Sequence, residues 1–234
     1  MKEITQIRKL SLWIFFLPLI AINICLFIST NYHFFENSII QVDQIGRTAF
    51  TIPYLDGGTS ISRVSRTFPQ YLIFKPAMIL TGILLMFYWN YNNRLMNKFK
   101  NTENLKYKFR IFGILSAIFL IIHSIFLGIK FDIQIYKLFR RVILLSFIIF
   151  EIIAQGILVY HFFKIKNQIS EISNKKILNL KITLVALLTT VALLSLPILI
   201  AKGNTHFKHG LEWNYFVGVI VFYLLTFFFW KRTT

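Results

Sequence analysis

Five ionisable side chains lie within long apolar stretches of this sequence: Lys75, His123, Glu151, His161 and Glu212. A charged group inside a bilayer is energetically costly, so such residues usually face the interior of a helix bundle or a water-filled cavity. In such a place they can transfer protons or hold a charged ligand. These positions therefore indicate chemistry or ligand binding within a membrane.

Glu212, His123 and His206 are the candidates for a general base. A carboxylate or an imidazole can take up a proton at working pH when burial shifts its pKa towards that pH. Structural interpretations stay open for two of them. Glu212 begins an apolar helix, where the positive end of the helix dipole stabilises a carboxylate, and His123 could form a hydrogen bond between two helices.

The pair His206 and His209 has the spacing of two metal ligands on a helix, but the flanking Gly203 and Gly210 favour a loop. Cys25 is the only cysteine, so an intramolecular disulfide and a Cys-based zinc site are excluded. We therefore predict neither a metal nor another cofactor.

A second set combines hydroxyl and basic side chains near the predicted outer ends of the helices. Guanidinium groups bind phosphate through paired hydrogen bonds, so this set predicts a site for the acidic head group of a lipid. Snorkelling of the basic side chains to lipid phosphates, without a specific ligand, is the alternative. Glu151 lies deeper, where it either functions or links two helices. The predicted head-group residues are Ser60, Ser62, Arg63, Arg66, Lys75, Arg140 and Arg141.

Long apolar blocks must position these residues. Of the 234 residues, 56% are hydrophobic and only 15% are charged, against about 25% charged residues in soluble domains. The apolar residues fall in blocks of about 20, the length that an α-helix needs to cross a bilayer. We predict an all-α, polytopic membrane bundle of six transmembrane helices in a single domain, with the first helix retained as an anchor. The predicted spans are 10–29, 71–91, 111–127, 142–163, 182–201 and 211–230.

The positive charge indicates topology. The net charge of +17 comes from short segments between apolar blocks, among them the segment 164–181 with Lys181 at its end. No basic stripe interleaved with aromatic residues suggests a nucleic-acid partner. Because the basic residues are concentrated in the segments on one side, the positive-inside rule predicts that both termini lie in the cytosol.

The first extracytoplasmic loop, residues 30–70, is predicted to be much longer than the others. It contains an alternating stretch over 47–55, followed by the turn Asp56-Gly57-Gly58, in which glycine supplies the positive φ of a tight turn. Long loops in compact proteins are usually functional or disordered, and the apolar residues of this one favour an ordered cap over the bundle.

Several short motifs occur in a recognisable order. Ile52-Pro53-Tyr54-Leu55-Asp56-Gly57-Gly58 is followed by Ser60-Ile61-Ser62, Phe68-Pro69-Gln70, Tyr88-Trp89-Asn90-Tyr91 and, near the end, Leu211-Glu212-Trp213. With six spans and a long first loop, the chain resembles the FRAG/DRAM/Sfk membrane family over nearly its whole length.

This resemblance implies work on lipids, and in the GPI-remodelling branch it implies fatty-acid remodelling with an acyl-transfer step. The positions that match that branch are Ser60, Ser62, Pro69 and Glu212. The sequence departs from the family where a His-Glu pair is expected before the fourth helix, because it has Leu138-Phe139-Arg140-Arg141 there.

Three functions follow from these observations. The first is a lipid-handling protein that binds a phospholipid or glycolipid head group at the outer leaflet and remodels its acyl chains. The second is a non-enzymatic scaffold or lipid sensor with a membrane-protein partner. The third is a proton- or ion-coupled transporter that uses Glu151, although the broken helix typical of transporters is missing. The location is the plasma membrane in a bacterium, as the Ile-, Lys-, Asn- and Phe-rich composition favours, or an endomembrane in a eukaryote.

Overall fold

The computed structural model describes residues 2–99, 106–129, 134–201 and 203–231, and this part of the chain is almost entirely helical. No strand occurs within these ranges beyond an isolated bridge between Ser173 and Trp230. The long helices are α1 (Lys2–Thr30), α3 (Tyr71–Met96), α4 (Lys106–Phe126), α5 (Gln134–Lys164), α6 (Lys175–Ile200) and α7 (Thr205–Phe229). Between α1 and α3 lie the 3₁₀ turns η1 (Tyr32–Phe35) and η2 (Gln44–Gly46) and the short helix α2 (Ile61–Ser65).

The six long helices are each long and apolar enough to cross a membrane. This confirms the prediction of an all-α fold with six helices that could cross a membrane, although the helices extend past most of the predicted limits. Hydropathy marks only the part of a helix inside the hydrocarbon, whereas backbone hydrogen bonding continues into polar residues at the interface. The largest differences are at the starts of α1 and α5, which begin at Lys2 and Gln134 rather than at residues 10 and 142, and α7 begins at Thr205 rather than at residue 211.

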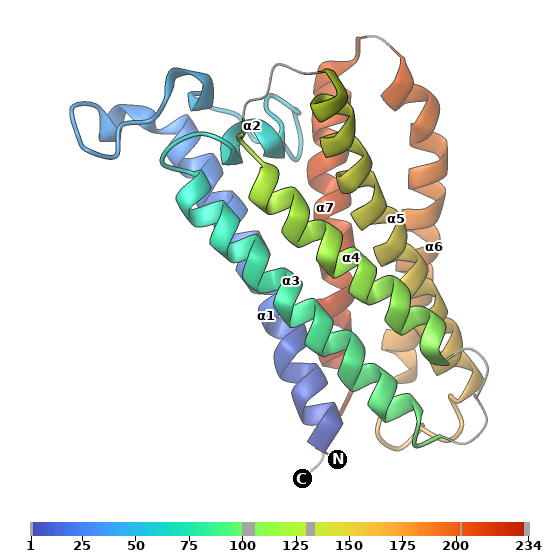
Figure 1. The fold of residues 1–234 in the computed structure, drawn as a ribbon. Coiled ribbons are helices and arrows are strands. Elements are labelled where there is room, and N and C mark those ends of the chain that lie inside the picture. The colour runs from blue at the N-terminus through green and yellow to red at the C-terminus, as the bar shows by residue number, and fades with distance from the viewer. Residues whose placement is uncertain (1, 100–105, 130–133, 202, 232–234) are drawn as a thin grey trace.

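The long helices form a closed ring. Each packs against its neighbours along the chain, and α7 also packs against α1 (Figure 1). Both termini lie at one end of the ring, and residues 31–70 lie at the other (Figure 1). We call these the terminal end and the cap end, and we call residues 31–70 the cap.

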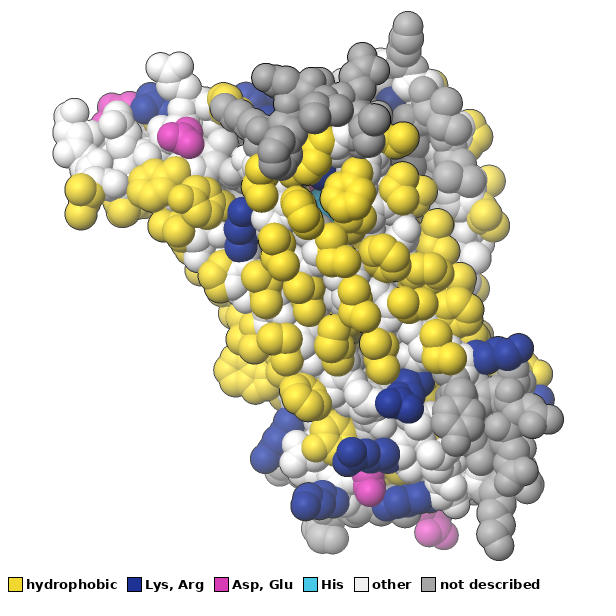
Figure 2. Space-filling model, in the orientation of Figure 1, with side chains coloured by type: hydrophobic (Ala, Val, Ile, Leu, Met, Phe, Trp, Pro, Cys, Tyr) yellow, Lys and Arg dark blue, Asp and Glu magenta, His cyan; other side chains and the backbone are white. Residues whose placement is uncertain are grey.

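Close packing in the ring depends on small residues at contact points. At Gly113 on α4, an added Cβ would lie 2.3 Å from the Trp89 ring on α3, so only glycine allows this approach. The outward surface is different: large hydrophobic side chains cover the middle of the bundle, and basic side chains gather at the terminal end (Figure 2). Such a surface suits a hydrocarbon layer bounded by charged head groups.

The cap is attached to the bundle by hydrogen bonds from both sides. The Tyr54 hydroxyl donates to Asn23 Oδ1 on α1 at 3.1 Å. From α7, Trp213 Nε1 donates to the Thr59 carbonyl at 2.9 Å, and Asn214 Nδ2 donates to the Tyr54 carbonyl at 2.7 Å. The Tyr54 and Trp213 rings also meet edge to face at 4.9 Å. The motif that begins at Ile52 therefore seats the cap on α7.

Candidate functional site

Three arginines approach one another at the cap end. Arg63 lies in the last turn of α2, Arg66 directly follows that helix, and Arg140 lies near the start of α5. Burial lowers the pKa of the Arg66 guanidinium, and the positive charges of Arg140 and Arg63 lower it further. Among the described residues, no carboxylate lies within 4.0 Å of these guanidinium groups. We call Arg63, Arg66 and Arg140 the arginine cluster; it carries positive charge that an anion would balance.

Two buried nitrogens, one in the cluster and one beside it, have no hydrogen-bond partner in the part of the chain that the structure describes. His123 on α4 lies close enough to Arg140 for an electrostatic interaction between the two side chains. Within the described ranges, neither Arg140 Nε nor His123 Nδ1 has a hydrogen-bond partner. Because a buried polar atom without a partner is costly, these two atoms suit a ligand that supplies acceptors.

The other predicted head-group cations are placed differently. Lys75 Nζ on α3 donates to the Ile125 carbonyl at the end of α4 at 3.2 Å, and it lies 5.5 Å from the Tyr71 ring centroid. Its ammonium group therefore links α3 to α4. No interaction between Lys75 and the arginine cluster is seen in the described part of the chain. The side chain of Arg141 lies outside the described residues.

Ser60, Ser62 and Glu212 come together at the N-terminal end of α2. Ser60 caps this helix by accepting a hydrogen bond from the Arg63 backbone N–H at 3.2 Å. The Glu212 carboxylate of α7 faces the backbone N–H groups of Ile61 and Ser62. Pro69 is buried further along the cap. The α2 segment therefore joins the positions matched by the family resemblance to the arginine cluster.

The three candidate bases do not form one site. His123 lies beside Arg140, Glu212 lies at the start of α2, and His206 is exposed on the first turn of α7. The prediction that His206 and His209 lie in a loop was wrong, because α7 already begins at Thr205. Asn204 and Gly203 adopt positive φ and make the turn there, and the helix then continues through Gly210.

His209 is used in attaching the cap: its Nδ1 lies 3.1 Å from the Gly57 carbonyl. No group of three or more metal-ligating side chains occurs among the described residues. The geometry around His206 and His209 is thus that of a contact between the cap and α7.

Gly57 provides a test of that contact. Its φ is +62°, and an added Cβ would lie 1.8 Å from the His206 carbonyl oxygen. We expect Gly57→Ala to lower stability by about 1–3 kcal/mol more than positive φ alone does, because backbone must move to admit the methyl group. Gly203→Ala is the matched control, since Gly203 has φ +87° but no heavy atom within 4 Å of an added Cβ. Equal thermal unfolding midpoints for the two variants in detergent would contradict the contact.

Asp56 makes the turn before Gly57 sensitive to pH. Hydrogen bonds from Thr51 Oγ1 and from the backbone N–H groups of Gly58 and Ile52 lower the pKa of this exposed carboxyl below its usual value. A lowered pKa in the folded state means that the stabilisation is complete above the usual pKa of about 4 and is lost as the pH falls through the lower folded value.

We therefore expect hydrogen exchange at Gly58, corrected for its intrinsic rate, to accelerate below about pH 4 in the wild type. The Asp56→Asn variant should exchange faster than the wild type at neutral pH and show no such step. A wild-type profile without the step would refute this role of Asp56.

A separate polar core lies inside the ring. Glu151 on α5 is 1% exposed. Its carboxylate accepts hydrogen bonds from Ser116 Oγ on α4 at 2.5 Å, from Gln155 Nε2 at 3.0 Å and from the Tyr223 hydroxyl on α7. The predicted mid-membrane carboxylate thus links three helices.

Lys181 also belongs to this core. The sequence predicts that Lys181 lies in the basic segment 164–181 outside the membrane, but the structure places it on α6, where it is fully buried. Its Nζ donates to Thr226 Oγ1 at 2.6 Å and lies 3.9 Å from the Phe222 ring centroid. The Tyr88 hydroxyl lies 3.2 Å from the same Thr226 Oγ1, so Thr226 links Lys181 to Tyr88. The available signal was the position of Lys181 among Leu178, Leu180 and Ile182, which marks an apolar stretch of helix.

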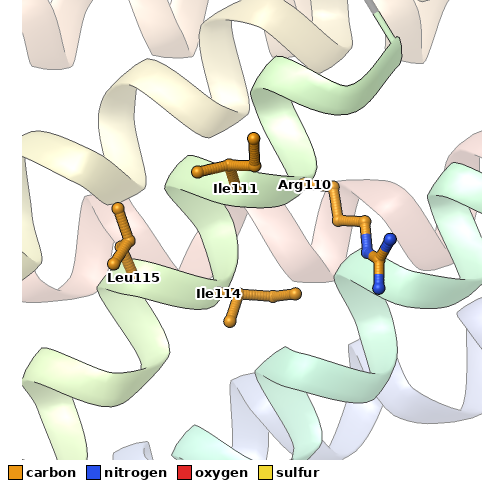
Figure 3. A pocket seen from close by; sticks show the side chains of 4 residues that line it. All are labelled: Arg110, Ile111, Ile114 and Leu115. Atoms are coloured by element: carbon orange, nitrogen blue, oxygen red, sulfur yellow. The ribbon is translucent and has the colours of Figure 1, made fainter.

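Two shallow grooves lie on the outer surface, away from these sites. One, of about 350 Å³, runs along α4 past Arg110, Ile111, Ile114 and Leu115 (Figure 3). The second has a similar volume and lies on α1 beside Lys9 and Trp13. In each, one basic side chain borders an apolar surface, as expected where a snorkelling residue meets lipid.

In comparisons with known proteins, the chain matches no family model, no curated protein and no solved structure. The resemblance to the FRAG/DRAM/Sfk family therefore remains a prediction, and the function has to be argued from the geometry described above.

Proposed function

We propose that this protein is an integral membrane lipid-handling protein whose cap end binds the anionic head group of a phospholipid or glycolipid at the extracytoplasmic leaflet. The basic side chains at the terminal end support this orientation, because the positive-inside rule puts them, and both termini, in the cytosol. The cap end then faces the opposite leaflet.

The arginine cluster carries the proposal. Three guanidinium groups approach one another without a carboxylate among the described residues to balance them. Phosphate is the membrane anion best suited to this arrangement, because guanidinium groups bind it through paired, charge-assisted hydrogen bonds. The unpartnered Arg140 Nε adds a donor at the same place, and His123 Nδ1 adds a second in the tautomer that carries the proton on that nitrogen.

In the enzymatic form of this proposal, the bound lipid undergoes acyl-chain remodelling. Glu212 is the preferred base, because it accepts hydrogen bonds from the first backbone N–H groups of α2, the short helix that also carries Arg63. A head group held at Arg63 and Arg66 would place the ester bonds of the lipid along this part of the cap. His123 lies next to the arginine cluster instead and serves in binding.

Lipid mass spectrometry of whole membranes tests the proposal. Membranes from cells lacking the protein are compared with membranes from cells that carry the wild type, Arg140→Gln or Glu212→Gln. We expect a specific lipid class to change its acyl chains in the deletion and to be restored by the wild type alone. Normal protein levels of both variants, measured in the same membranes, exclude loss of folding.

The two variants separate binding from chemistry. If Glu212→Gln restores the lipids and Arg140→Gln does not, head-group binding holds and the catalytic role of Glu212 is refuted. If all membranes have the same lipid profile, the protein does not remodel lipids, and a scaffold or lipid sensor becomes the better description.

The polar core favours a second candidate function, a proton- or ion-coupled transporter. Glu151 and Lys181 are both fully enclosed in the ring, and neither forms an ion pair among the described residues. Gln155 Oε1 and Asn92 Oδ1 are buried acceptors without a partner there. Ionisable groups in such positions often mark proton or ion pathways.

Liposomes that enclose a pH-sensitive dye distinguish this second function. A transporter predicts dye responses with the wild type that Glu151→Gln abolishes and that Glu212→Gln leaves unchanged. Wild-type liposomes that respond no faster than empty ones would eliminate proton transport and leave the polar core as a structural link.

A further inference from the structure

Residues 31–47, which we call the arm, leave the bundle sideways at the cap end (Figure 1). The arm contains η1 and η2 and returns to the end of α1, where the Thr48 backbone N–H donates to the Ser29 carbonyl at 3.1 Å. Much of it therefore extends beyond the ring of helices, over the place where the surrounding lipid would lie.

The arm has a defined shape, because the Arg47 side chain contacts three other residues of the arm. Arg47 Nε donates to the Val42 carbonyl at 3.0 Å, and its guanidinium lies 3.6 Å from Glu36 Oε1 and 5.0 Å from the Tyr32 ring centroid. At the base, the Asp43 backbone N–H donates to the Phe68 carbonyl, and Arg63 Nε donates to the Ile45 carbonyl. These contacts fix which face of the arm points towards the membrane.

The two faces of the arm differ in character. Hydrophobic side chains lie on the face turned towards the apolar surface of the bundle, and acidic side chains lie on the opposite face (Figure 2). Ile39 is 98% exposed and Phe34 is 78% exposed, and Ile40 and Ile45 are also exposed. The described protein leaves Ile39 and Phe34 largely uncovered and covers about half of Ile40 and Ile45.

We propose that the arm is a membrane-interface element that inserts Phe34, Ile39, Ile40 and Ile45 into the lipid leaflet at the cap end. The lipid surface is the occupant that the position favours, because the apolar face of the arm continues the hydrophobic surface of the helices (Figure 2). A segment with an apolar face towards the acyl chains and a polar face towards water is the arrangement seen in interfacial elements. This inference needs only that the six helices cross a membrane, so it does not depend on head-group binding.

Spin labels on the arm test the proposal in the full-length protein reconstituted in phospholipid nanodiscs. Single cysteines replace Ile39, Phe34 and Glu36 in three variants. The native Cys25 is fully buried, and wild type treated with the same spin-label reagent measures any background reaction at this residue. For each label, the accessibility to oxygen, which concentrates in lipid, is compared with the accessibility to a water-soluble nickel complex.

The labels at Ile39 and Phe34 should have an oxygen-to-nickel accessibility ratio several-fold above that of the label at Glu36, which marks the polar face. Labels at Ile39 and Phe34 that are as open to nickel as the label at Glu36 would overturn the proposal. Labels at Ile39 and Phe34 that are accessible neither to oxygen nor to nickel would also overturn the proposal, because this result would show that a protein partner covers the arm. The two positions are independent, so misfolding of one variant leaves the other as a test.

Discussion

Replacing Arg66 and Arg140 together by Gln is expected to lower the affinity of the protein for an anionic phospholipid by about 100-fold. Hydrogen bonds to charged groups contribute about 1.5–3 kcal/mol each, and about 1.4 kcal/mol corresponds to a tenfold change in affinity. Both side chains belong to the arginine cluster, so the variant removes two charge-assisted contacts and relieves the repulsion between two like charges. Titration with a fluorescent anionic phospholipid in zwitterionic detergent measures the effect.

The matched control changes the same charge at the other end of the bundle. Arg94 and Lys176 are exposed at the terminal end, and replacing both by Gln should leave the affinity within about twofold, because surface charges contribute little at ordinary ionic strength.

Asp132, which is outside the described residues, is the acidic residue nearest to Arg140 in the sequence. An Asp132→Asn variant that binds lipid far more tightly than the wild type would identify this carboxylate as a competing counter-ion, contrary to our account.

The second large effect is expected in the polar core, where Glu151→Ala should lower the free energy of unfolding by at least about 2 kcal/mol. The substitution removes three hydrogen bonds, and such bonds between membrane helices contribute about 0.6 kcal/mol each on average, with a cavity adding to the loss. For a chain of this size, 2 kcal/mol corresponds to about 4–8 °C in the thermal midpoint.

Two variants control for that result. Glu151→Gln keeps an acceptor oxygen for Tyr223 and should lose less stability than Glu151→Ala. Glu171→Ala makes the same chemical change at an exposed position and should shift the midpoint by no more than about 2 °C. Similar midpoints for Glu151→Ala and Glu171→Ala would show that the polar core does not hold α4, α5 and α7 together.

The bundle could be predicted from the sequence because a bilayer imposes a length on apolar helices. All six long helices follow from that constraint, and the helices extend past most of the predicted limits because hydropathy does not report where backbone hydrogen bonding stops. The first turns of α7, at the cap end, are an example. Gly203 and Gly210 suggest a loop there, but only Gly203 needs a positive φ.

The sequence placed the three arginines in one predicted set, but it did not predict which candidate base lies beside them. Arg63, Arg66 and Arg140 were predicted to bind a head group, and the structure brings them together. Glu212 and His123, predicted as alternative bases, have different neighbours at the cap end: Glu212 faces the start of α2, and His123 lies beside Arg140. Such grouping depends on how the cap folds onto α7, which no periodicity in the sequence encodes.

Lys181 was missed for a related reason. A lysine near the end of an apolar stretch normally extends to the interface, so its type and position favour exposure. Its burial depends on Thr226 and on the Phe222 ring, which lie on α7, the next helix along the chain. A contact between α6 and α7 therefore decides where this charge lies.

The most direct test of anion binding at the cap end is native mass spectrometry of the protein extracted gently with its resident lipids. We predict that the wild type carries a bound phospholipid or glycolipid, and that the Arg66→Gln, Arg140→Gln double variant, folded to the same thermal midpoint as the wild type, has lost it. The Arg94→Gln, Lys176→Gln control should retain the lipid. A wild type without resident lipid, or a double variant that retains as much as the control, would contradict our account.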